Sequence, residues 1–485
     1  MTKAKLVLSV LAASLTLVGC GSVGIAVGPD YQRPVLETPT TWGVLPAQDK
    51  AAVNVNVLSW WKSFKDPVLN SLLDEAVANN QDLVLAAGRI EEARATATGT
   101  HSNRFPVIDA TLSANKSRTS ENAGKLAAGA NAVSKDFQAG LNASYEIDFW
   151  GKLARADEAS RARLLAQEAN RGLVQSSLYS TLAQNYFALR AYDAQAALSE
   201  SALITRQENL RLQQKRFSAG SIGELDLHLA ESETATAEIS LAQAKQALAN
   251  TESALAVLSG RSPSAIAQPV IVRGSSIDML YQQLTLPSDL PSDLLNRRPD
   301  IMAAEQALIA ANADVGQAKA QYFPSLKLTT GIGDESRVFQ DLFNPASLLW
   351  NIGANLVQPV FRAGAIGAVV SGAEARKTQA LAQYVQTVQG AFRDVHDALI
   401  NANANAQIYT ASKRRVVALK DSLRLADLRY KNGYSSYLEV LSAQRDLLQA
   451  EASLIDTKRA HLSAVVSLYK AVGSDWDKPL SLAAK

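Results

Sequence analysis

The chain has very little cysteine and histidine, two residue types that often serve as metal ligands or in catalysis. Its 485 residues include one cysteine and four widely spaced histidines, so no disulfide can form within the chain and no cluster has metal-ligand spacing. No nucleophile elbow, metal motif or phosphate-binding loop accompanies its many carboxylates. We therefore expect a protein that is not an enzyme, with no catalytic residue, no metal and no cofactor.

An excess of charge of one sign is also missing. The 48 Lys and Arg residues face 46 Asp and Glu residues, and the only charges before Cys20 are Lys3 and Lys5, so a chain that starts at Cys20 is formally neutral. Nucleic-acid-binding proteins and polybasic membrane-surface proteins need a surplus of cations. Because the chain lacks this surplus, we do not expect nucleic acid as a partner.

Long hydrophobic runs are absent after the N-terminus. Leu6 to Val18 form an apolar stretch that is too short to span a bilayer, and no later segment has 18 uninterrupted apolar residues. Any membrane crossing must then be made by strands. The first segment ends Leu17-Val18-Gly19-Cys20, which resembles a bacterial lipobox.

The lipobox predicts a signal peptide over residues 1–19 and a lipid on Cys20. Gly21, rather than Asp, follows the cysteine, which under the bacterial sorting rule indicates the cell outer membrane, with the chain extending into the periplasm. The alternative is an ordinary secretory signal with an incidental cysteine.

The rest of the chain consists of two similar halves. The segment 104–106 aligns with 322–324, and 216–220 aligns with 429–433. We expect an extended lipidated segment over 20–62, a first repeat over 63–262, a linker over 263–290, a second repeat over 291–473 and a tail over 474–485. Each repeat reads as a helix, two strands and a long helical hairpin.

Four segments alternate between apolar and polar residues, which predicts strands at about 105–118, 135–150, 323–333 and 347–361. Their polar faces are expected to line a water-filled barrel lumen. The residues assigned to that lumen are Asp109, Asn142, Glu146, Asp148, Asn351 and Asn355. The alternative reading is an edge hairpin that packs on a soluble core.

Two proline-free stretches, from Lys152 to about Phe217 and from Ile366 to Tyr430, predict helices of roughly 100 Å. Helices of this length need lateral partners, as in coiled coils. They are expected to turn near 218–223 and 431–436 and to return as shorter helices. Because four strands cannot close a barrel, several chains must share one, and a homotrimer with twelve strands leaves room for a lumen.

The ordered set of motifs is distinctive. The sequence resembles the outer-membrane efflux channel family typified by TolC, in its lipoprotein branch. The matching motifs are Val27-Gly28-Pro29-Asp30-Tyr31-Gln32-Arg33-Pro34, Trp60-Trp61-Lys62-Ser63-Phe64-Lys65-Asp66-Pro67, Leu295-Asn296-Arg297-Arg298-Pro299-Asp300-Ile301 with Ala303-Ala304-Glu305, and Phe323-Pro324.

This resemblance implies a mixed α+β membrane protein, a trimeric twelve-stranded outer-membrane β-barrel continued by a helical periplasmic tunnel. It implies passive export, with a periplasmic adaptor and an inner-membrane pump, usually of the resistance-nodulation-division class, as partners. It leaves the substrate open. Two alternatives remain: a coiled-coil envelope lipoprotein without a pore, and a type I secretion exit duct.

The resemblance also assigns roles near the second turn. Counting from Gly433, it places Leu438, Glu439 and Ser442 at the periplasmic aperture, and it matches Tyr430 to a tyrosine that helps hold the tip closed. Ser442 stands where relatives commonly carry a second carboxylate. The turns marked by Gly220, Asp226 and Gly433 are the expected adaptor contacts. The alternatives are a solvated helix charge for Glu439 and ordinary packing for Tyr430.

Lipidation can be tested directly at the cysteine. We expect Cys20→Ser to abolish incorporation of labelled palmitate, because a serine hydroxyl cannot replace the thiol that is diacylated. Gly21→Ala, which changes the neighbouring small residue, serves as the control and should still be labelled. Label that persists in the serine variant would refute the lipobox interpretation.

Overall fold

The computed structural model describes residues 26–37, 57–123, 127, 129, 131–284 and 298–473. The predicted signal peptide, Cys20, Gly21 and the tail over 474–485 lie outside the described residues. Two compact units share the chain. One contains Ile90–Ala166 and Ala304–Tyr384 with the described residues before Val35, and the other contains the remaining described residues. Each unit combines parts of both repeats, so the repeat boundaries stay a prediction.

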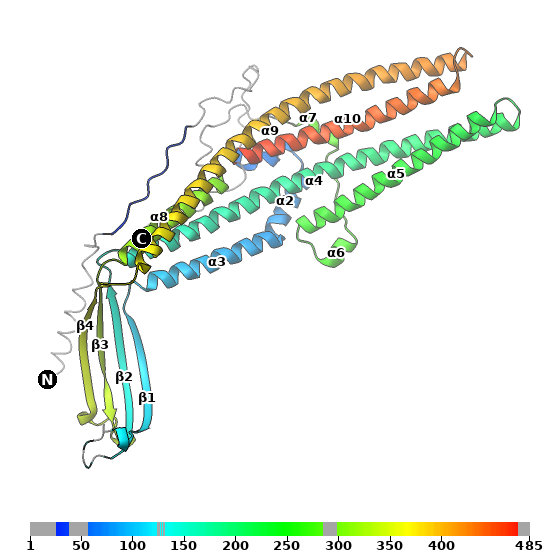
Figure 1. Ribbon diagram of the computed structural model, residues 1–485. Helices are drawn as coiled ribbons and strands as arrows, with labels where there is room; N and C mark the ends of the chain where they lie inside the picture. Colours follow the sequence, from blue (N-terminus) through cyan, green and yellow to red (C-terminus); the bar gives the residue numbers. More distant parts are fainter. Residues whose placement is uncertain are drawn as a thin grey trace. The chain divides into compact units, whose positions relative to one another are not determined.

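The first unit contains an antiparallel sheet of four strands in chain order, which lie side by side in Figure 1. Their bounds are β1 Val107–Arg118, β2 Val133–Ile147, β3 Ser325–Ser336 and β4 Leu348–Val357. Pro106 lies directly before β1, and Pro359 lies two residues after β4. Proline has no N–H to donate to a strand ladder, so β4 ends before the predicted residue 361.

The register separates a polar face from an apolar face. Asp109 pairs with Asn142, which pairs with Gly331, which pairs with Asn351. Paired residues share a face. The opposite face carries large apolar side chains that are exposed in the single chain, namely Ile108, Leu112, Leu141, Ile332, Trp350, Ile352 and Leu356. A sheet with this exposed face fits contact with lipid.

Two long helices follow the strand pairs, and each returns as a shorter helix. α4 (Lys152–Ser218) and α9 (Ala365–Lys431) have 67 residues each, while α5 (Glu224–Leu258) and α10 (Tyr437–Ala471) have 35 each. In Figure 1, α5 runs back beside α4 and α10 runs back beside α9. Among the described residues, none of the helices is both long and apolar enough to cross a bilayer.

Shorter helices complete the pattern. α3 (Gln81–Ser102) leads into β1 and α8 (Pro299–Ala320) leads into β3, with 22 residues each. Val57–Phe64 form the 3₁₀ helix η2, so residues 57–62 are not extended as the sequence reading expected. The other elements are α2 (Pro67–Asn79), α6 (Pro263–Ala267), α7 (Ile277–Gln282), η3 (Glu121–Ala123), η5 (Phe339–Asp341) and η6 (Pro345–Ser347).

The second unit has an aromatic core around a buried carboxylate. Trp60 stacks on Tyr469 with ring centroids 5.5 Å apart. Asp66 is fully buried and caps α2 by accepting from the amide of Val68 at 2.8 Å. Its other oxygen accepts from the Tyr186 hydroxyl at 2.7 Å and from the Ser275 amide at 2.9 Å. This side chain therefore joins three distant segments of the chain.

The contribution of the Asp66 contacts to stability can be measured by removing the carboxylate. We expect Asp66→Ala to lower the free energy of unfolding by about 3 kcal/mol, because it removes a helix cap and leaves a buried hydroxyl and amide unpaired. Thermal unfolding of the detergent-solubilised protein, followed by circular dichroism, gives the readout. Exposed Asp74 on the same helix is the matched control. Equal stability of the two alanine variants would show that the joint contributes nothing.

Candidate functional site

Both long helices end in the same backbone motif, at the turns that the repeat predicts. Gly220 and Gly433 have positive φ values of 68° and 78°, a conformation that favours glycine. The Ser221 amide donates to the carbonyl of Arg216 at 2.8 Å, and the second turn repeats this bond. Such a bond satisfies a carbonyl that the helix leaves unpaired. The two hairpin tips are therefore built alike.

The helices after the turns begin with acidic residues. Glu224 and Asp226 lie in the first turn of α5, and Glu439 lies in the first turn of α10. Carboxylates at this position are stabilised by the unpaired amides of a helix N-terminus. Asp226 is partly buried, whereas Glu224 is exposed. Adaptor contact at Gly220, Asp226 and Gly433 stays a prediction.

Tyr430 connects the two hairpins. The guanidinium Nη1 of Arg216, in the last turn of α4, donates to the Tyr430 hydroxyl at 2.7 Å. The Arg216 Cζ atom also lies 6.0 Å from the centre of the Tyr430 ring. The neighbouring Tyr437 ring is 5.7 Å away, and its hydroxyl accepts from Asn209 at 2.7 Å. Tyr430 is thus held by a specific polar contact as well as by packing.

The three predicted aperture residues have different surroundings. Leu438 is exposed, Ser442 is partly buried, and the Glu439 side chain is half-exposed. A carboxylate oxygen of Glu439 lies 3.6 Å from Nη1 of Arg429 at the end of α9. Glu439 and Ser442 lie three residues apart on α10, so their side chains share one face of that helix. The position of these residues at an aperture stays a prediction.

The sequence did not predict the contacts of two arginines in the first hairpin. Arg216 binds Tyr430, and Arg206 lies 3.3 Å from Glu233 on α5 while it also donates to Gln444 on α10. The repeat aligns Arg216 with Arg429, but this alignment does not indicate a contact with Tyr430. The buried position of Arg206 had no local signal, since its partners are distant in the sequence.

The polar face of the sheet brings several predicted lumen residues together. Asp109, Asn142 and Asn351 share one row across the sheet, and Glu146 and Asn355 share another row with Lys327. In the first row, Gly331 lies between Asn142 and Asn351. A Cβ added to Gly331 would lie 2.8 Å from the amide oxygens of both asparagines. The glycine therefore makes room for a continuous polar row.

Asp148 does not belong to these rows. β2 ends at Ile147, and the Asp148 carboxylate accepts from the amide of Ala154 at 2.7 Å, near the start of α4. This contact gives Asp148 a capping role at the junction between strand and helix. Glu146 also reaches toward this junction, since its carboxylate is 2.9 Å from Nζ of Lys152.

The N-terminal motif packs on α8. The Glu305 carboxylate accepts from the Tyr31 hydroxyl at 3.0 Å and from Nε of Arg33 at 2.7 Å. Burial and the Glu305 charge raise the pKa of Tyr31, so the phenol stays neutral. Gly28 crosses Gly316 so closely that a Cβ on Gly28 would lie 2.6 Å from the Gly316 Cα. The motif fixes the described segment after the predicted lipid site.

Comparison with known proteins identifies the family. The family described as outer membrane efflux protein matches residues 72–261 and 290–474. The cation efflux system protein CusC of Escherichia coli K12 is 36% identical over 464 residues, with 95% of this chain and 97% of that protein covered. The probable outer membrane lipoprotein SilC of Salmonella typhimurium is 32% identical, with 97% and 99% covered.

A solved structure agrees with this assignment. The Campylobacter jejuni CmeC outer membrane channel superposes with a TM-score of 0.87 at 27% identity, with 94% of this chain and 96% of that chain covered. The names of CusC and CmeC describe an efflux system protein and an outer membrane channel. The predicted fold class, outer-membrane location and efflux-channel function are confirmed, and the chain belongs to the outer membrane efflux protein family.

Proposed function

We propose that three copies of this chain close one twelve-stranded barrel in the outer membrane and continue it as a helical tunnel into the periplasm. The observation that carries the proposal is the pair of open sheet edges. Within the described residues, β1 and β4 each pair on one side only, while one face of the sheet is apolar and exposed. An unpaired strand edge is too costly in lipid, so the edges of neighbouring copies must meet.

In this assembly, the tunnel conducts substrates passively, and a periplasmic adaptor and an inner-membrane pump of the resistance-nodulation-division class supply them. The relative CusC is named for cation efflux. On the polar face of the sheet, four carboxylates face a single cationic side chain, Lys327. The carboxylates are Asp109, Asp136, Glu146 and Glu335. Such a lumen favours positively charged substrates over anions.

The lipid on Cys20 adds a second attachment. The name of SilC, a probable outer membrane lipoprotein, supports this anchoring. Two or more acyl chains hold a protein firmly at a membrane surface, whereas a single chain holds it only marginally. The barrel then crosses the bilayer while the acyl chains insert into one leaflet, and the Arg216–Tyr430 bond lies at the opposite end of the chain's long helices.

The pore itself can be tested with the purified full-length chain in planar bilayers. We expect a mass that corresponds to three chains, discrete channel conductance, and a potassium preference over chloride that falls when Asp109 is replaced by Asn. Asp74→Asn on helix α2 provides the control and should conduct as the parent does. A monomer without conductance would contradict the proposal and favour a structural lipoprotein.

The tip contact predicts a change in gating. Tyr430→Phe removes the acceptor of the Arg216 bond, which joins α4 to α9. Hydrogen bonds to charged groups contribute about 1.5 kcal/mol or more, so we expect the ratio of open to closed time in bilayer recordings to rise roughly tenfold.

Tyr434→Phe is the matched control, because Tyr434 is the residue after the turn glycine and its side chain is exposed. The control should leave the ratio of open to closed time unchanged. Equal ratios in the two phenylalanine variants would assign Tyr430 to packing alone.

A further inference from the structure

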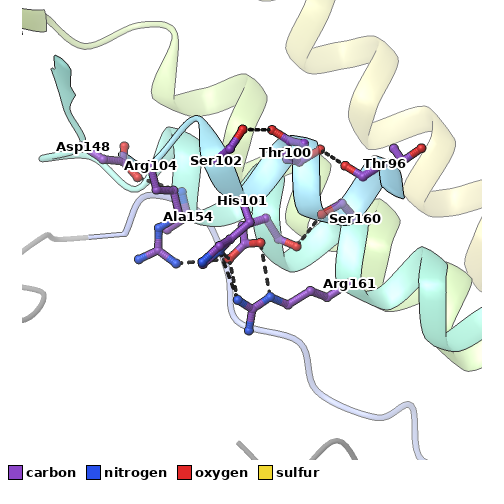
Figure 2. Close-up of polar contacts among 11 residues, drawn as sticks. Thr96, Thr100, His101, Ser102, Arg104, Asp148, Ala154, Ser160 and Arg161 are labelled. Atoms are coloured by element: carbon purple, nitrogen blue, oxygen red, sulfur yellow. Dashed lines mark hydrogen bonds and ion pairs between the residues drawn. The ribbon is translucent and has the colours of Figure 1, made fainter. Parts of the chain in front are cut away.

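Two cationic arginines and a histidine surround one buried carboxylate beside the start of β1. Asp157, near the start of α4, has a side chain that is only 4% exposed. Its Oδ2 atom lies 3.1 Å from Nδ1 of His101 and 3.1 Å from Nη1 of Arg104. Arg161, one turn along α4, places Nε 3.2 Å from Oδ1. Figure 2 shows His101 of α3, Arg104 of the turn after α3 and Arg161 of α4 pointing toward one another.

The cations in this group outnumber the carboxylate. Two guanidinium groups share one Asp157, and their side chains are 41% and 59% exposed. Arg104 uses only Nη1 and Arg161 uses Nε and Nη2 toward Asp157, so further N–H groups on both have no partner among the described residues. Burial alone would raise the pKa of Asp157, but bonds from His101 and Arg104 outweigh it and lower that pKa. The ionised carboxylate therefore holds both arginines in place, while their remaining N–H groups stay accessible at the surface.

The second repeat shows that this surplus is not needed to join a helix to a strand. The two alignments place Lys319 at the position of His101 and Glu374 at the position of Arg161. Lys319 and Glu374 form a single neutral ion pair at 2.9 Å. Tyr322 takes the place of Arg104. The same junction is thus built with balanced charge in one repeat and with excess positive charge in the other.

The surroundings of the cationic group fit the boundary of a membrane. Arg104 lies three residues before β1, at the end of the sheet from which the helices continue. Phe105 and Ile108 are exposed, and Ile108 belongs to the apolar face of the sheet. Exposed aromatic and aliphatic side chains beside arginine are typical of the level at which lipid headgroups lie.

We propose that His101, Arg104 and Arg161 form a binding site for the phosphate of an anionic phospholipid in the periplasmic leaflet. Arginine is suited to this role because its planar fork binds two phosphate oxygens at once. The buried Asp157 positions the guanidinium groups before the lipid arrives, which reduces the entropy lost on binding. Phe105 and Ile108 lie where the glycerol backbone and the acyl chains begin.

The test measures lipid binding and does not depend on transport. Full-length protein in a neutral detergent is titrated with short-chain phosphatidylglycerol, and thermal stabilisation gives the affinity. Each arginine near an anionic membrane surface contributes about 1 kcal/mol of binding free energy, which corresponds to about fivefold in affinity. We therefore expect Arg104→Gln to weaken binding about fivefold. Arg104→Lys, which retains the charge, should lose less. Lys319→Gln, the repeat-equivalent control, should bind as the parent does.

Arg104→Gln is preferred to a change at Asp157 or Arg161, because it leaves Asp157 paired with His101 and Arg161. Short-chain phosphatidylcholine and inorganic phosphate are titrated in parallel, and neither should stabilise the parent at the same concentration. Equal protection by inorganic phosphate would show a site for free anions and overturn the lipid assignment. Equal affinity of Arg104→Gln and Lys319→Gln for phosphatidylglycerol would overturn the site itself.

Discussion

The need to pair every backbone N–H and C=O in hydrocarbon determines how this protein is built. One chain supplies four strands, and within its described residues the outer two each leave an edge without a partner. In water such an edge would be tolerable, but in lipid each unpaired group costs several kcal/mol. The sheet is also poorly suited to water, because its exposed apolar face would be hydrated at a cost in free energy. A barrel that pairs these edges therefore needs strands from several chains.

The long helices depend on the same assembly. A helix of 67 residues cannot be stable through its own hydrogen bonds alone, and packing along its length must contribute. In the first unit, small residues such as Ala159, Ala162, Ala310 and Ala313 form the contacts between α4 and α8. Small side chains let helices approach closely, and this close approach suits a wall in which each helix has neighbours on both sides.

The distinctive motifs turn out to be polar joints. Asp66 binds Tyr186 and Ser275, Glu305 binds Tyr31 and Arg33, and Arg298 binds Asp394 at 3.1 Å and the carbonyl of Ala471 at 3.0 Å. Each joint connects segments far apart in the chain. A buried charged group is stable only when its partners are all in place, so these residues specify which segments meet. Asp66, Arg298 and Glu305, which belong to the family motifs, therefore form contacts between distant segments of the chain.

Local periodicity was enough to predict the strands, the long helices and their turns, since alternation, the absence of proline and the turn glycines act within a few residues. It also predicted a polar sheet face that includes Asp109, Asn142 and Asn351. Tertiary structure alone decided that Arg216 reaches Tyr430, that Asp148 caps α4, and that His101, Arg104 and Arg161 meet at Asp157. These contacts join residues on different elements, and no pattern along the chain encodes which distant side chain will arrive. Backbone geometry repeats with a fixed period, whereas the choice of partner depends on how whole elements pack.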